Sequence, residues 1–169
     1  VVMDVGQGDA ILVQDGSHAL LVDTGPDGAV VDALARLHVV HLDAVLLTHL
    51  HDDHYGGLDD LVGHVTCDEV LVARGVAQEM PDEVAKACDE LAHGCVREVG
   101  CGDECVVGGF VARVVWPWTP VTGTVNEDSL ELVVSYEEGG QSLSALLTGD
   151  AEREETSQVV AAGEVGDID

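Results

Sequence analysis

The feature that most constrains the fold is a cluster of histidines and aspartates directly after a short apolar run. The run covers residues 42–47 (LDAVLL), and its length and composition predict a buried strand. Three histidines and two aspartates follow within the six positions 49–54. His49 and His51 are two residues apart, so both imidazoles project to one side if the strand continues that far. The Gly-Gly pair at 56–57 lets the backbone bend closely beneath them.

This cluster predicts a metal site. Two or three imidazoles that converge with a carboxylate suit Zn²⁺ or another borderline divalent ion. The alternative is a solvated polar loop, but five ionisable residues directly after a buried strand favour a ligand set. The spacing H-x-H-x-D-H, from His49 to His54, resembles the metal-binding signature of the metallo-β-lactamase superfamily at every position. The resemblance implies a hydrolytic site without specifying a substrate.

Two aspartates outside the cluster are candidates for the same site. Asp150 follows an apolar stretch in a Thr-Gly-Asp turn, as the histidines follow theirs, and is the best candidate for a further ligand. Its alternative role is the N-cap of a helix from Ala151. Asp23 ends the stretch Leu20–Val22 and is expected to hold the free N–H of a metal-bound imidazole, or else to be a simple turn residue. The other histidines are expected to be structural or exposed; they are His18, His38, His41, His64 and His93.

The charge of the chain argues against a nucleic-acid binding surface. Acidic residues number 33 against 6 basic ones, which gives a net charge of −27. Such a surface repels phosphate backbones and lacks the basic footprint of nucleic-acid binders, so weak DNA binding is expected. The acidity reflects solubility in a salt-rich or acidic-proteome source, or it attracts divalent cations. The scattered distribution of the charges favours the first explanation.

The length predicts one domain, residues 1–169, with a substantial core. No apolar stretch approaches the roughly 18–20 residues that span a bilayer. Five cysteines leave the redox compartment open. Cys101 and Cys105 flank a turn and could form a disulfide or a soft metal site, although free thiols are favoured.

The apolar periodicity predicts strands and helices in blocks. Meandering strands with helices between the blocks favour an α+β protein with two packed sheets covered by helices, an αββα sandwich. The predicted strands are 1–5, 10–14, 18–23, 44–47, 69–73, 95–99, 105–107, 110–116, 130–136 and 143–147. The predicted helices are 29–39, 57–65, 81–92 and 151–162.

Four further segments make the resemblance to a family more specific. The segments 2–13 (VMDVGQGDAILV) and 21–26 (LVDTGP) resemble the start of the C-terminal domain of ComEC-type DNA-internalisation channels. The segments 126–133 (NEDSLELV) and 146–152 (LLTGDAE) are similar to later signatures of that family, in the same order. The resemblance therefore extends over nearly the whole chain, and the DVGQGDA motif is more specific than the histidine motif.

This resemblance implies a four-layer αββα metallo-β-lactamase sandwich that holds two divalent ions, Zn²⁺ or Mn²⁺. It implies His49, His51, Asp53, His54 and Asp150 as metal ligands, with Asp53 also positioning the nucleophile. Asn126 stands where the superfamily often has a histidine, and Asn126 and Ser129 are implied to contact substrate. The family continues with a His-His-Gly segment that supplies a ligand to the second ion. The chain is therefore expected to be truncated at its C-terminus, with that second site incomplete.

The implied function is a phosphodiesterase or nuclease domain of a DNA-uptake membrane protein that degrades the strand that is not imported. Its expected partners are single-stranded DNA and the transmembrane channel domain of the same chain. The expected location is the extracytoplasmic face of the cell membrane. Two alternatives remain: a stand-alone hydrolase of a small ester, thioester or lactone, and a non-catalytic extramembrane module with a degenerate metal site.

Overall fold

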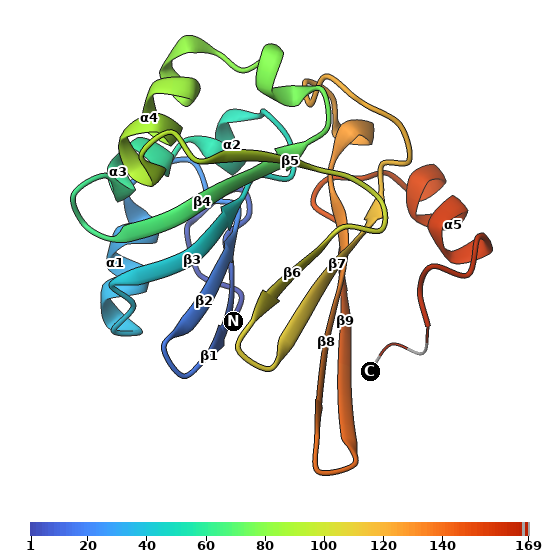
Figure 1. Cartoon of the computed structure of the whole chain (residues 1–169). Helices are drawn as coiled ribbons and strands as arrows, with labels where there is room; N and C mark the ends of the chain where they lie inside the picture. Colours follow the sequence, from blue (N-terminus) through green and yellow to red (C-terminus); the bar gives the residue numbers. More distant parts are fainter. Residues whose placement is uncertain (167, 169) are drawn as a thin grey trace.

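The strands form two sheets that face each other, with helices outside both (Figure 1). The computed structural model describes residues 1–166 and 168. The first sheet has the order β1-β2-β3-β4-β5, in which β1 is antiparallel to β2 and the other pairs are parallel. Its strands are β1 (Ile11–Asp15), β2 (His18–Val22), β3 (His41–Leu46), β4 (Thr66–Ala73) and β5 (Val96–Val99).

The second sheet is antiparallel throughout, in the order β6-β7-β8-β9. Its strands are β6 (Glu104–Val107), β7 (Phe110–Trp116), β8 (Glu131–Glu138) and β9 (Gln141–Leu147). The backbone N–H of Leu130 donates to the carbonyl of Thr48 at 3.0 Å, which ties the start of β8 to the segment just after β3.

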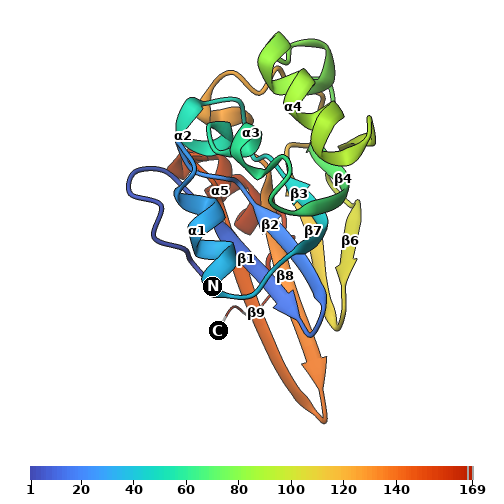
Figure 2. The same cartoon turned by 90° about the vertical axis from the view of Figure 1, so that its left-hand side faces the viewer.

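Helical crossovers connect the parallel strands, as parallel pairing requires. The helices α1, α3 and α4 cover the outer face of the first sheet, while α5 lies outside the second (Figures 1 and 2). This arrangement confirms the αββα sandwich. The helices are α1 (Ala29–Arg36), α2 (Asp52–Tyr55), α3 (Leu58–Leu61), α4 (Asp82–Ala92) and α5 (Arg153–Ala161), and two 3₁₀ turns are η1 (Val76–Gln78) and η2 (Asn126–Asp128).

The core is built from aliphatic side chains of the central strands. Leu20, Val45 and Val70 lie on three neighbouring strands and are fully buried. Because parallel strands covered on both faces need apolar residues at successive positions, β2, β3 and β4 carry near-continuous Val, Leu and Ala runs. Because β2, β3 and β4 are parallel, their carboxyl ends meet at one edge of the sheet, where polar loops can gather.

Several predicted elements differ from the structure at their ends. Residues 1–5 do not form a strand but only a single bridge between Val2 and Ile11, because the backbone turns at Gly6 and Gly8, both with positive φ. The helix predicted for 57–65 is limited to α3, and the short α2 was not predicted. The last helix begins at Arg153 with Glu152 as its N-cap, so the N-cap role considered for Asp150 is wrong.

The structure also bears on the cysteines and on membrane-spanning segments. All five cysteines have free thiols, so Cys101 and Cys105 form no disulfide. Among the described residues, no helix has the length and apolar character needed to cross a membrane.

Candidate metal centre

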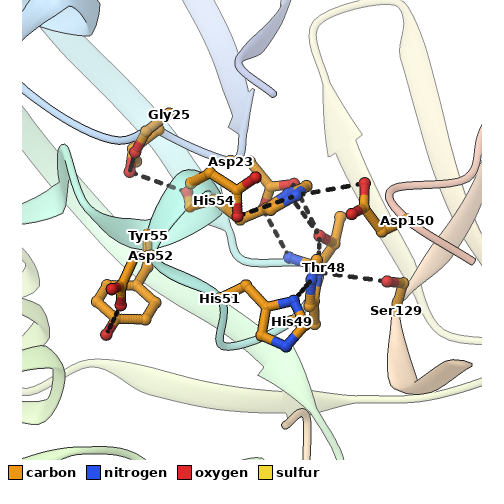
Figure 3. Close-up of polar contacts among 12 residues, drawn as sticks. Asp23, Gly25, Thr48, His49, His51, Asp52, His54, Tyr55, Ser129 and Asp150 are labelled. Carbon is orange, nitrogen blue, oxygen red and sulfur yellow. Dashed lines mark hydrogen bonds and ion pairs between the residues drawn. The ribbon is translucent and has the colours of Figure 1, made fainter. Parts of the chain in front are cut away.

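The histidine cluster lies on the loop that leaves β3 and on the short helix α2 (Figure 3). The segment can turn tightly there because two glycines follow. A Cβ atom on Gly56 would lie 2.4 Å from the carbonyl oxygens of Asp52 and Pro26, and one on Gly57 would lie 2.6 Å from that of Thr24. Larger residues would push the loop off the preceding strand ends, so this close approach explains the Gly-Gly pair.

Asp23 is the buried acceptor that organises the cluster. Its carboxylate, 1% exposed, accepts hydrogen bonds from the Thr48 N–H at 2.8 Å and the Thr48 hydroxyl at 2.7 Å. It also lies 2.7 Å from Nδ1 of His54, which therefore carries the proton and donates. Burial raises the pKa of Asp23, and the hydrogen bonds from His54 and Thr48 oppose that rise.

In the neutral imidazole of His54, the proton on Nδ1 leaves the other ring nitrogen, Nε2, with a free lone pair that can bind a metal. Burial lowers the pKa of His54, but the hydrogen bond and charge of Asp23, with the charges of Asp150 and Asp53, outweigh burial and raise it. Nε2 is buried and has no hydrogen-bond partner. It lies 3.4 Å from Asp150 Oδ1 and 3.9 Å from Asp53 Oδ1.

His49 lies against His54, with ring centroids 4.2 Å apart. Its Nδ1 is 3.1 Å from the Thr48 hydroxyl and 3.3 Å from that of Ser129. Its Nε2 faces Nδ1 of His51 at 2.9 Å. Burial, followed by the charges of His54 and His51, lowers the pKa of His49 to about 4, so this imidazole is neutral at physiological pH and one of its two nitrogens can bind a metal.

The donor set fits a divalent metal ion. One ligand atom each from His49, His54 and Asp150 lies within 4.8 Å of the others. An orphaned, buried imidazole nitrogen is costly unless a metal or water completes it. Nitrogen and carboxylate oxygen ligands together suit Zn²⁺ and similar ions.

The predicted residues occupy different places around this group. His51 is paired with His49, and its Nε2 lies 3.1 Å from the carbonyl of Thr124. Asp53 is partly exposed beside His54. Asn126 begins η2, where its carbonyl accepts the N–H of Ser129 at 3.0 Å. Ser129 is fully buried with its hydroxyl near His49. This burial argues against the substrate contact expected for Ser129 and favours a role in holding the His49 imidazole.

Three contributors escaped the sequence reasoning. Thr48 bridges Asp23 and His49 through one hydroxyl. Asp9 lies beside Asp23 and His54, with ligand atoms of all three within 4.8 Å of one another. A Cβ on Gly8 would lie 2.0 Å from the carbonyl oxygen of Asp53. The DVGQGDA motif that contains Gly8 and Asp9 was the available signal, but its place beside the histidines follows only from the fold.

Comparison with known proteins agrees with this geometry. Residues 3–161 match the family model of the metallo-beta-lactamase superfamily. The chain is 28% identical to ComE operon protein 3 of Bacillus subtilis, an alignment that covers 94% of this chain and 23% of that protein. It is 49% identical over 53 residues to a hydroxyacylglutathione hydrolase of Aeromonas salmonicida and 46% identical over 55 residues to a ribonuclease Z of a Mycobacterium species. This chain thus spans about a quarter or less of these relatives.

Solved structures show the same fold. A subclass B3 metallo-beta-lactamase from a soil metagenome, MEM-A1, superposes with a TM-score of 0.68 at 16% identity, covering 99% of this chain and 73% of that one. The subclass B3 enzyme BJP-1 of Bradyrhizobium japonicum gives 0.58 over 96% of this chain and 69% of its own. With the family-model match over residues 3–161, these observations establish that the chain belongs to the metallo-β-lactamase superfamily.

Proposed function

We propose that this chain is the metal-dependent phosphodiesterase domain of a DNA-uptake membrane protein. The observation that carries the proposal is the orphaned Nε2 of His54 beside Asp150 and His49, in a chain similar over 94% of its length to ComE operon protein 3. The superfamily includes metal-dependent hydrolases, and the phosphodiester specificity and DNA-uptake role are our inference. They rest on the motifs that resemble ComEC-type channels.

Five residues would hold two divalent ions. His49 and His51 would bind one ion, Asp53 and His54 the other, and the Asp150 carboxylate, with its two oxygens, would serve both. Zn²⁺ and Mn²⁺ both suit these nitrogen and oxygen donors. When bound, such ions lower the pKa of water and stabilise negative charge on phosphate oxygens.

The remaining residues would position these ligands and the substrate. Asp23 fixes the Nδ1–H tautomer of His54, and the hydroxyls of Thr48 and Ser129 contact Nδ1 of His49 and would orient its ring. Asp53, partly exposed beside His54, would accept a proton from the attacking water and hold that water in line with the phosphorus. Asn126, half-buried at the start of η2, would contact substrate.

The charge of the chain limits how the substrate arrives. At −27, the isolated chain attracts no polyanion, so productive delivery of single-stranded DNA would depend on the transmembrane channel domain of the same protein. We place the domain on the extracytoplasmic face of the membrane, where the strand that is not imported remains.

A second candidate function has support of its own. The similarity to a hydroxyacylglutathione hydrolase, over 31% of this chain, favours a small thioester or ester as substrate. The acidic surface would also repel a small substrate less than it repels DNA.

One assay separates the candidates. The purified chain, saturated in turn with Mn²⁺ and Zn²⁺, is given bis(p-nitrophenyl) phosphate, labelled single-stranded DNA, and a glutathione thioester. We expect weak cleavage of the phosphodiesters that depends on added metal. His51→Ala should remove this cleavage, and Asp59→Asn, on an exposed residue of α3, should leave it intact. Thioester cleavage alone would favour the second candidate. Bound metal without any hydrolysis, or no stoichiometric metal at all, would favour a non-catalytic module.

A further inference from the structure

A second group of histidines and aspartates lies at the opposite end of the first sheet from the candidate metal centre. It gathers the amino-terminal ends of β2, β3 and the first residues of β4, whereas the loop and helix α2 that carry His49–His54 lie beyond the carboxyl end of β3 (Figure 1). The four residues concerned were expected from sequence to be structural or exposed, or were not singled out: His18, His41, Asp43 and Asp68.

Strand register brings His41, Asp43 and Asp68 to one face. His41 and Asp43 are two apart on β3 and therefore share a face. In the pairing of β3 with β4, His41 stands opposite Thr66 and Leu42 opposite Cys67, which places Asp68 beside Asp43. His18 begins β2, and its Nδ1 lies 3.0 Å from Asp43 Oδ1.

The ring nitrogens of His41 have distinct environments. The Thr66 hydroxyl donates to the carbonyl of Val40 at 3.4 Å, so it can accept from the Nδ1–H of His41 at 3.0 Å, and in that tautomer Nε2 carries a free lone pair. Nε2 is 3.6 Å from Asp68 Oδ2, too long for a good hydrogen bond. Two ligands bound at about 2.1 Å in a tetrahedral shell lie roughly 3.4 Å apart, so this spacing is close to that of two ligands sharing one ion.

The carboxylate of Asp43 is held in place by the backbone of β2. Asp43 accepts the backbone N–H of Ala19 through Oδ2 at 2.6 Å, which orients its carboxylate. Ligand atoms of His41, Asp43 and Asp68 lie within 4.8 Å of one another. A cavity of about 260 Å³ is lined by His18, His41 and Asp43 among others, and it leaves room for an ion with its water.

We propose that His41, Asp43 and Asp68 bind a divalent ion of the zinc class, with His18 as a fourth ligand. Two imidazoles and two carboxylates are a borderline set that selects Zn²⁺ over Mg²⁺ and Ca²⁺, which prefer oxygen alone. The His18 side chain is 56% exposed and free to rotate from Asp43 onto the ion. The bound ion would join the starts of three strands, so the site is structural and independent of the hydrolytic reaction.

The site is tested by counting zinc. Equilibrium dialysis with elemental analysis measures Zn²⁺ bound per chain in about 0.1 M salt, where diffuse attraction to the −27 surface is screened beyond about 10 Å. We expect His41→Ala to lose one equivalent relative to the unmodified chain. The expected loss of affinity is at least the roughly 10–100-fold that disturbing a supporting residue of a metal site causes.

The controls separate a built site from diffuse binding. His64→Ala removes an exposed histidine outside the group and should leave the count unchanged. Asp68→Asn alters a side chain that is 70% exposed, so it should weaken zinc binding without unfolding the chain. Neither His41→Ala nor Asp68→Asn should change hydrolysis. Equal zinc counts and affinities in the unmodified chain, His41→Ala and Asp68→Asn, or an equal loss in His64→Ala, would overturn the proposal whether or not the chain proves to be a hydrolase.

Discussion

Asp23 offers the sharpest test of the candidate metal centre, because one buried carboxylate controls both folding and the tautomer of His54. Replacing it by alanine leaves three buried donors without an acceptor: the N–H and hydroxyl of Thr48 and the Nδ1–H of His54. Each orphaned donor costs about 1–3 kcal/mol, so Asp23→Ala should destabilise the fold by about 3 kcal/mol or more. For a chain of this size that corresponds to a fall in Tm of about 6–12 °C.

Asp23→Asn separates the two roles. The asparagine oxygen can still accept the Thr48 N–H, and the Thr48 hydroxyl can rotate to suit the new amide. The amide NH₂ then faces Nδ1 of His54 and favours the tautomer protonated on Nε2, the atom 3.4 Å from Asp150. A protonated nitrogen cannot be a ligand, so metal affinity should fall about 10–100-fold, or about 1.4–2.8 kcal/mol, with most of the stability kept.

The assay is isothermal titration of Zn²⁺ into the metal-free chain, with thermal unfolding followed in parallel. Asp59→Asn, which makes the same change on an exposed residue of α3, is the control. Zinc affinity in Asp23→Asn equal to that of the unmodified chain would refute the assignment of His54 Nε2 as a ligand. An Asp23→Ala variant as stable as the parent would refute the hydrogen-bond argument itself.

Three further predictions rest on separate features. Gly8→Ala should lower Tm and metal affinity more than Gly6→Ala. Both glycines have φ near +86°, but only at Gly8 would the new Cβ lie 2.0 Å from the carbonyl oxygen of Asp53. Equal losses in the two variants would show that backbone strain alone matters. Burial raises the pKa of Glu131 from 4.5 to about 7, so the folded state holds this proton where the unfolded chain releases it. Stability should therefore fall between about pH 4.5 and 7, and Glu131→Gln should flatten that fall in urea unfolding and be the more stable protein at pH 8; an unchanged pH profile would contradict this. The isolated chain should bind single-stranded DNA weakly in fluorescence anisotropy, because it lacks the Lys and Arg needed for counterion release, and tight binding with a steep salt dependence would show that the surface has been misjudged.

The fold could be predicted from sequence because its signals are local. Apolar runs such as Leu42–Leu47 define buried strands by length and composition, and the alternation with helical stretches then leaves few architectures. The failures also have local causes. The apolar residues 1–5 resemble a strand, yet the positive φ of Gly6 and Gly8 turns the chain after them, and only Val2 pairs.

The residues of the candidate metal centre were predictable for a different reason. His49, His51, Asp53 and His54 are adjacent in sequence, and Asp23 and Asp150 each follow an apolar strand, so chain topology alone sends them to one edge. Thr48 and Ser129 could not be assigned in this way. Their roles depend on hydroxyl directions and on the contact between residues 48 and 130 that joins the two sheets, which no local pattern encodes.

The two proposed metal-binding groups should differ in affinity, because their side chains differ in burial. Aligned strands gather side chains at both ends of a sheet, at His49 and His54 beyond the carboxyl end of β3 and at His18 and His41 at the amino ends. His49 and His54 are 1% exposed and each is held by a hydrogen bond at one ring nitrogen, so little rotamer freedom remains to be lost when a metal binds. His18 and the Asp68 carboxylate are mostly exposed, and ordering them opposes binding. Because its ligands are already held in place, the group of His49, His54 and Asp150 should bind zinc first, and the group of His41, Asp43 and Asp68 second.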